Sequence, residues 1–152
     1  MALAAGVLAA PGASAQTAPQ GVTELSAGAA LAWSHRDLYA VELGAGRRSG
    51  QARLALAAAG GRLSDGWGGR VEARGQFVLL PFARVGLGWY GGMGAAWMGG
   101  AGQRGAVYLT ALTGVEHAPG RPRGWFVEVG VGGGVRVSAG MRWRNFPNWW
   151  PQ

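Results

Sequence analysis

Residues 70–79 read Arg-Val-Glu-Ala-Arg-Gly-Gln-Phe-Val-Leu, a stretch in which charged or polar and apolar residues alternate. Successive side chains of a β-strand point to opposite faces, so strict alternation predicts a strand with two chemically different faces. The apolar face would carry Val71, Ala73, Phe77 and Leu79, and the other face Arg70, Glu72, Arg74 and Gln76. The stretch therefore predicts a β-strand that separates charge from hydrocarbon.

The same alternation recurs along most of the chain. Together with the run above it gives eight predicted strands, at about 22–34, 38–47, 51–60, 69–80, 83–97, 104–117, 124–132 and 134–144. The predicted turns between them are short and include Gly60–Gly68 and Gly99–Gly102, so neighbouring strands should pair antiparallel as hairpins. Regular short strands indicate a sandwich or a barrel, and the fold class predicted is all-β: a single antiparallel up-and-down β-barrel of about eight strands.

Composition supports this prediction. Thirty of the 152 residues are Gly, and each interior Gly would destabilise a helix by about 1 kcal/mol relative to Ala. Eight Trp, three Tyr and four Phe are too many aromatic residues for a disordered polar chain. The chain has no Cys, which excludes disulfides and thiolate metal sites.

The N-terminus has the pattern of an export signal. Residues 2–10 form a short apolar run, Pro11 and Gly12 interrupt it, and Ala13-Ser14-Ala15 offers a small-x-small cleavage site. No basic residue precedes the run, and it is far shorter than the ~20 residues of a membrane-spanning helix. The predicted organisation is a signal-peptide-like segment over 1–15, a β-barrel domain over 16–146 and a C-terminal tail over 147–152.

The second face of the strands holds all five Glu residues of the chain and many of its Arg residues. The predicted salt-bridge network comprises Glu24, Glu42, Arg53, Arg70, Glu72, Arg74, Arg84, Glu116, Glu128, Arg136 and Arg142. In a soluble β fold this face would meet water, whereas in a membrane barrel it would line the lumen. The face is also rich in Gly, which a narrow eight-stranded lumen needs beside large side chains. The balance therefore favours a membrane barrel whose lumen is filled by Glu–Arg pairs.

Aromatic residues on the apolar face lie near the ends of the predicted strands. They are Trp33, Tyr39, Trp89, Trp97, Trp125 and Trp143. Such placement is typical of the two aromatic girdles at membrane interfaces. The alternative is that each of them fills an ordinary hydrophobic core.

The formal charge of +7 comes from fourteen Arg residues and no Lys. An Arg-rich surface can attract nucleic acid or anionic lipid. These residues, however, are spread along the chain, mostly inside predicted strands, and do not cluster, so we expect no nucleic-acid partner.

The final predicted strand, Gly134-Val135-Arg136-Val137-Ser138-Ala139-Gly140-Met141-Arg142-Trp143, ends on an aromatic residue. With the signal-like start and the eight alternating runs, the chain over about 20–146 resembles the small eight-stranded outer-membrane barrels of Gram-negative bacteria. The resemblance implies an outer-membrane location, with membrane lipid and the barrel-assembly machinery as partners. The chain departs from the family by continuing past Trp143 to Trp149 and Trp150, which could anchor at the interface or cover the barrel mouth.

Few residues suggest chemistry. His35 lies beside Ser34 and Asp37 in a predicted turn, but catalytic triads are assembled in space, so a polar turn is the better interpretation. His117 is expected at the barrel rim, and no His-x-Ser pair of the kind expected for a lipid-modifying barrel enzyme is present. We therefore expect no catalytic residues, no metal, no cofactor and no identifiable small-molecule substrate.

These observations predict a non-enzymatic outer-membrane barrel with a structural or surface-interaction role. Two alternatives stay open: a soluble periplasmic barrel that binds an apolar ligand, and a lipid-modifying barrel enzyme. The sequence names no ligand and no oligomeric state.

Overall fold

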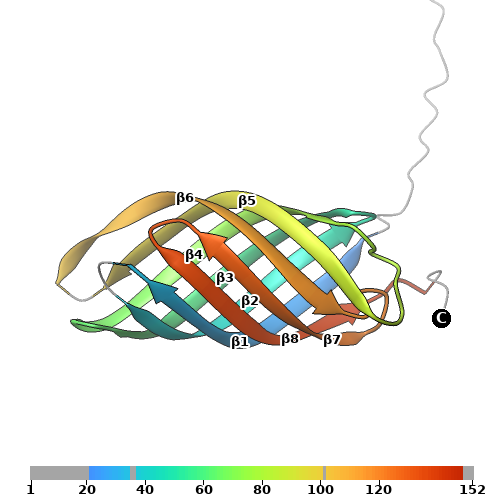
Figure 1. Ribbon diagram of the computed structural model, residues 1–152, viewed down its shortest axis with the longest axis horizontal. Coiled ribbons are helices and arrows are strands. Elements are labelled where there is room, and N and C mark those ends of the chain that lie inside the picture. Colours follow the sequence, from blue (N-terminus) through green and yellow to red (C-terminus); the bar gives the residue numbers. More distant parts are fainter. Residues whose placement is uncertain (1–20, 35–36, 101, 149–152) are drawn as a thin grey trace, which may run out of the picture.

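The structure is a computed structural model and describes residues 21–34, 37–100 and 102–148. In this part of the chain eight antiparallel strands follow one another in sequence order and close into a barrel (Figure 1). The strands are β1 (Val22–Trp33), β2 (Leu38–Ser49), β3 (Ala52–Leu63), β4 (Gly66–Val78), β5 (Leu87–Gly100), β6 (Gln103–His117), β7 (Arg123–Val131) and β8 (Val135–Asn145). The predicted fold class is confirmed. The signal-like segment 1–15, His35 and the Trp149-Trp150 pair lie outside the described residues.

The first and last strands close the barrel. β1 pairs with β8 in continuous register from Thr23–Asn145 to Trp33–Val135, and Figure 1 shows the blue and red strands side by side. Val22 and Asn145 consequently lie at one end of the barrel, here called the termini end, and the opposite end is called the turn end. Residues 50–51, 79–86 and 118–122 connect strands at the termini end, whereas the turn end has only residues 34–37, 64–65, 101–102 and 132–134.

Several predicted boundaries differ from those of the structure. The glycine-rich stretch 60–68 is not a loop, because β3 and β4 continue through it to a two-residue turn at Ser64 and Asp65. The predicted turn over 99–102 is also too long, because β5 continues to Gly100 and β6 begins at Gln103. The fifth strand begins at Leu87 instead of 83, because Pro81 and the positive φ of Gly86 (76°) interrupt the extended backbone before it.

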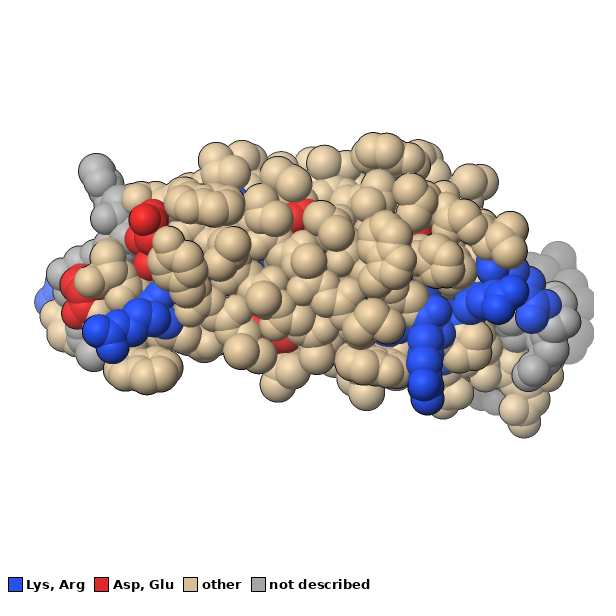
Figure 2. All heavy atoms as spheres, turned by 60° about the horizontal axis from the view of Figure 1, so that its bottom comes forward, with Lys and Arg blue, Asp and Glu red and all other residues tan. Residues whose placement is uncertain are grey.

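The polarity of the barrel is inverted relative to a soluble protein. Outward side chains are large and apolar: Leu54 is 72% exposed and Leu109 87% exposed. Inward side chains include fully buried Glu116 and Glu128. On the face shown in Figure 2, the middle of the barrel is covered almost entirely by uncharged side chains.

The six aromatic residues singled out above are all exposed and divide between the two ends. Trp33, Tyr39 and Trp97 lie near the turn end, and Trp89, Trp125 and Trp143 lie near the termini end. Trp67, which the sequence placed in a loop, is on β4 near the turn end and is 70% exposed. The outer surface therefore has an aliphatic band with aromatic residues on both sides. No helix in the described part of the chain is long and apolar enough to cross a membrane.

Candidate functional site

The barrel interior is the most unusual part of the molecule, because it is filled mainly by ionised side chains. Five Glu and seven Arg residues point inward and are at most 5% exposed: Glu24, Glu42, Glu72, Glu116, Glu128, Arg48, Arg53, Arg70, Arg74, Arg136, Arg142 and Arg144. Each comes from an inward position of its strand, and all eight strands except β5 contribute at least one. They form two layers along the barrel axis.

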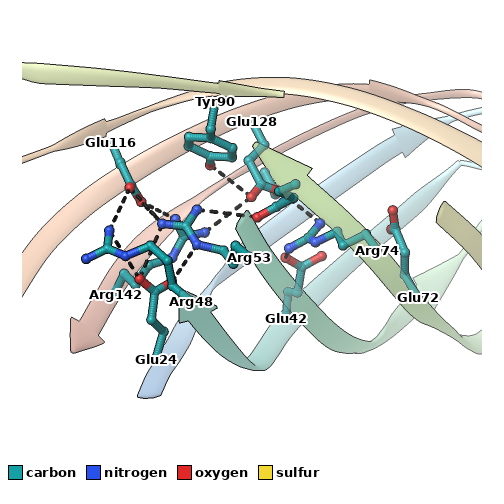
Figure 3. Close-up of polar contacts among 12 residues, drawn as sticks. Glu24, Glu42, Arg48, Arg53, Glu72, Arg74, Tyr90, Glu116, Glu128 and Arg142 are labelled. Atoms are coloured by element: carbon teal, nitrogen blue, oxygen red, sulfur yellow. Dashed lines mark hydrogen bonds and ion pairs between the residues drawn. The ribbon is translucent and has the colours of Figure 1, made fainter. Parts of the chain in front are cut away.

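The first layer, the mouth cluster, lies near the termini end and comprises Glu24, Arg48, Arg53, Glu116, Arg142 and Arg144 (Figure 3). Glu116 is its centre. It accepts hydrogen bonds from Arg53 Nη2 (2.7 Å), Arg144 Nη2 (2.9 Å) and Arg142 Nη1. Arg53 also pairs through Nε with Glu24 at 2.6 Å. Strands β1, β3, β6 and β8 are thereby linked through the lumen.

The second layer, the central cluster, comprises Glu42, Arg70, Glu72, Arg74, Glu128 and Arg136. Glu128 accepts hydrogen bonds from Arg74 Nη1 (2.9 Å) and Arg136 Nη2 (3.3 Å). Arg136 Nη1 donates to Glu42 at 2.8 Å, and Thr110 Oγ1 donates to Glu72 at 3.0 Å. Removing one member would therefore leave a buried charge without its partner.

Two inward aromatic residues lie where the layers meet, and Arg142 Nη2 also joins the layers by donating to Glu128 Oε1 at 3.3 Å. Tyr90, on β5, donates its hydroxyl to Glu128 at 2.9 Å. Its ring lies under the guanidinium groups of Arg53 (5.2 Å) and Arg142 (5.3 Å), and Phe126 lies 4.7 Å from that of Arg142. Cation–π contacts of this kind stabilise guanidinium groups that have left water.

The two layers differ in charge. The central cluster holds three Glu and three Arg, whereas the mouth cluster holds two Glu and four Arg, an excess of two positive charges. Arg48 carries part of this excess. It lies 3.5 Å from Glu24 and 3.9 Å from Glu116, and its Nε and Nη1 make no hydrogen bond.

Buried residues lie at both ends of the lumen. At the turn end Ala32, Leu38 and Leu63 form a small buried apolar cluster. At the termini end the connection 118–122 folds inward, and Arg48 Nη2 donates to the carbonyl of buried Pro119 at 3.0 Å. Ala118, which precedes it, adopts a left-handed backbone (φ 45°) that places the turn over the mouth.

A cavity of ≈ 10 Å³ lies between the two clusters, lined in part by Glu24, Ser26, Arg53, Arg74 and Arg142. A space of this size holds about one water molecule. It is polar, and the Nε atom of Arg74 beside it makes no hydrogen bond.

Ten of the eleven residues predicted for the network lie in these two clusters. Arg84 does not: it is exposed in the connection 79–86, because the strand to which the alternation assigned it begins three residues later. Sequence reasoning missed Arg48, Arg144 and Tyr90 as members of the network. Arg48 is six residues after inward Glu42 on β2, so a predicted strand one residue longer would have placed it inside. Arg144 lay within the predicted strand 134–144, two residues after inward Arg142, and alternation alone could have placed it inside.

The remaining chemistry candidates are modest. His117 ends β6, is half-buried and stacks on Trp125 with ring centroids 6.0 Å apart. Within the described residues, no three side chains of His, Cys, Asp or Glu gather as a possible metal site.

No protein-family model matches the sequence, and no curated protein matches it. Solved structures of similar fold include the following two. The N-terminal β-barrel domain of Pseudomonas aeruginosa OprF has a TM-score of 0.65 at 15% sequence identity, covering 83% of this chain and 100% of that chain. Neisserial surface protein A (NspA) has a TM-score of 0.58 at 17% identity, covering 82% of this chain and 96% of that chain. The chain therefore has the fold of the small eight-stranded outer-membrane β-barrels that its sequence resembles.

Proposed function

We propose that the protein is an integral outer-membrane barrel with a closed lumen and a structural or surface-interaction role. The observation that carries the proposal is the inverted polarity: hydrocarbon covers the outside and ion pairs fill the inside. A soluble protein exposes contiguous apolar patches of only a few hundred Å². A barrel in lipid has its apolar face outside and its polar face inside.

The spacing of the aromatic residues supports a membrane location. Trp89 and Trp97 lie on the outer face of β5, eight residues apart. A strand rise of about 3.4 Å puts them about 27 Å apart along the strand. A tilt of about 40° reduces this to about 20 Å along the barrel axis, close to the roughly 25 Å apolar band of outer-membrane barrels.

The packed interior supports a closed lumen. Arg53 and Arg142 reach across to Glu116, the Pro119 turn covers one end, and an apolar cluster fills the other. The cavity between the ion-pair layers holds about one water molecule. Eight strands enclose an interior just wide enough for side chains, so we expect no open pore.

A non-enzymatic role follows from the same interior. Glu116 and Glu128 are fully buried, and each contacts at least three Arg side chains. These buried carboxylates are paired with arginines and therefore serve as counter-ions within the barrel. The charged lumen also disfavours a carrier of apolar ligands, which would need an apolar cavity.

The test uses the full chain expressed in a Gram-negative bacterium. We expect the protein in the outer-membrane fraction, with faster gel migration before heating than after it, and no stepwise ion current in a planar bilayer. Recovery as a soluble periplasmic protein without a heat-dependent shift would overturn the membrane proposal. Stepwise currents from folded protein would overturn the closed lumen alone.

A further inference from the structure

The exposed charges at the two ends of the barrel differ. At the termini end Arg47, Arg84, Arg121 and Arg123 are exposed, and all the acids of this end, Glu24 and Glu116, are buried in the lumen. At the turn end the described residues include exposed Arg62 and Arg104, but also Asp37 and Asp65. On the face shown in Figure 2, one end displays blue side chains without red ones, and the other displays both.

The four arginines lie at the termini end, on β2, β7 and the connections 79–86 and 118–122; we call them the arginine ring. Arg123 begins β7, two residues before Trp125 on the same outer face. On β1, Leu25 is paired with Trp143 of β8. Arg47 of β2 is paired with Thr23, which lies two residues closer to the termini end than Leu25. Arg84 and Arg121 lie in adjoining connections, where Arg121 Nε donates to the carbonyl of Arg84 at 2.7 Å. Arg123 is directly paired with Trp143 on β8, and Arg47 lies two residues beyond that level, so the strand arginines lie at or just outside the level of the aromatic residues.

These positions match the level of lipid headgroups. Trp side chains occupy the interface of a bilayer, and charged groups just outside it meet the phosphate layer. Guanidinium groups bind phosphate oxygens through paired N–H donors. In the described part of the chain none of the four arginines has an ion-pair partner, so their charges are available to a ligand outside the protein.

The orientation of the barrel decides which leaflet the ring meets. The turn end has connections of two to four residues, whereas the termini end has residues 79–86, 118–122 and the two ends of the described chain, at residues 21 and 148. If the barrel inserts with its turn end first, only the short connections of that end cross the membrane, so the amount of polar backbone transferred is smallest. The arginine ring then stays in the leaflet from which the protein enters.

Building on the proposed membrane location, we infer that the arginine ring binds the phosphates of anionic glycerophospholipids in the leaflet at the termini end. Near an anionic surface each basic residue favours binding about fivefold. The ring would fix the depth of the barrel and surround that end with acidic lipid.

The experiment measures lipid preference by quenching of tryptophan fluorescence. Full-chain protein is folded into phosphatidylcholine vesicles that contain increasing fractions of dibrominated phosphatidylglycerol or dibrominated phosphatidylcholine. We expect phosphatidylglycerol to bind about threefold or more tightly to the wild-type barrel, with a preference that falls as salt rises. In the R47Q/R84Q/R121Q/R123Q variant the two lipids should bind equally.

Two further variants keep the result interpretable. R47Q/R123Q changes strand residues only, leaves the connections intact and should lose part of the preference. R62Q/R104Q removes two positive charges at the turn end instead, and this variant should retain most of the preference for phosphatidylglycerol. Equal binding of both lipids by the wild type, or equal loss from R62Q/R104Q and R47Q/R123Q, would overturn the inference.

Unlabelled lipid A serves as a competitor that tests the leaflet. Stronger displacement by lipid A than by phosphatidylglycerol, abolished in the fourfold variant, would assign the ring to the opposite leaflet and overturn the inference. Failure of the wild type to enter phosphatidylcholine vesicles, with no heat-dependent gel shift, would instead refute the proposed membrane location.

Discussion

Glu116→Gln is the substitution that most directly tests the charged interior. The change removes one negative charge and almost no volume. The remaining glutamine oxygen can satisfy one of the guanidinium groups of Arg53, Arg142 and Arg144, but the new amide NH₂ points a donor at the others. The positive excess of the mouth cluster rises from two to three charges.

The expected cost follows from the burial of the site. Glu116 is 0% exposed, so water cannot replace the lost partner. Breaking a buried ion pair by removing one member costs about 3–5 kcal/mol. We expect a loss of this size in the free energy of unfolding.

The assay is reversible urea unfolding in phospholipid vesicles, followed by tryptophan fluorescence. Arg104→Gln provides a matched control on the same strand, since its side chain is exposed and a surface change of this kind costs less than about 0.5 kcal/mol. The double variant E116Q/R144M restores the original charge excess and should recover part of the loss, with a coupling of about 0.5–3 kcal/mol. A stability of Glu116→Gln within about 1 kcal/mol of the wild type, at unchanged denaturant slope, would refute this account of the lumen.

Three other substitutions give separate tests. Met93→Arg places a charge midway between Trp89 and Trp97 on the outer face and should cost about 2–4 kcal/mol in vesicles; an unchanged free energy of unfolding would mean that lipid does not cover this face. Gly28→Ala should lower the free energy of unfolding by about 1–3 kcal/mol, because the new Cβ would lie 2.8 Å from Gly140 Cα across the β1–β8 pair. Gly75→Ala is the control, since its new Cβ meets no atom within 4 Å. Equal effects of the two substitutions in the same urea experiment would contradict the close approach of β1 and β8. Arg53→Met should lower the free energy of unfolding by at least about 1.5 kcal/mol more than Arg48→Met does. The reason is that Arg53 forms short ion pairs with two carboxylates, whereas Arg48 contributes to the positive excess. The reverse order of unfolding midpoints would show that the charge excess is not destabilising.

Alternation predicted the fold and the identity of most interior residues. Its signal was strong where both faces carry large side chains, as from Arg70 to Leu79. It failed where glycine removed one face of the pattern. Gly60 and Gly61 look like a loop in sequence, yet they extend β3, and a Cβ on Gly61 would lie 2.6 Å from Ala40 Cα.

The residues that were missed depend on turn lengths. Arg48 looked like part of a turn because Ser49 and Gly50 follow it, but Gly50 and Gln51 complete the hairpin alone, so β2 carries Arg48 into the lumen. The prediction for Arg84 was wrong for the opposite reason. The apolar alternation of Val85, Leu87 and Trp89 suggested a strand that includes Arg84, but the residues before Leu87 form a connection that is not extended. Single-sequence periodicity cannot show where pairing with a neighbouring strand stops.

The β1–β8 pairing also has a consequence for how the barrel is assembled. The other seven strand pairs join strands that are consecutive in the sequence. The β1–β8 pair instead brings Leu25 against Trp143, from the far end of the sequence. Such a contact carries the largest loop-closure entropy and gains nothing until the seven hairpins are in place. Until the seam forms, β1 and β8 are open edges able to pair with any other strand. The step that completes the barrel is thus also the step at which an unaided chain is most exposed to aggregation.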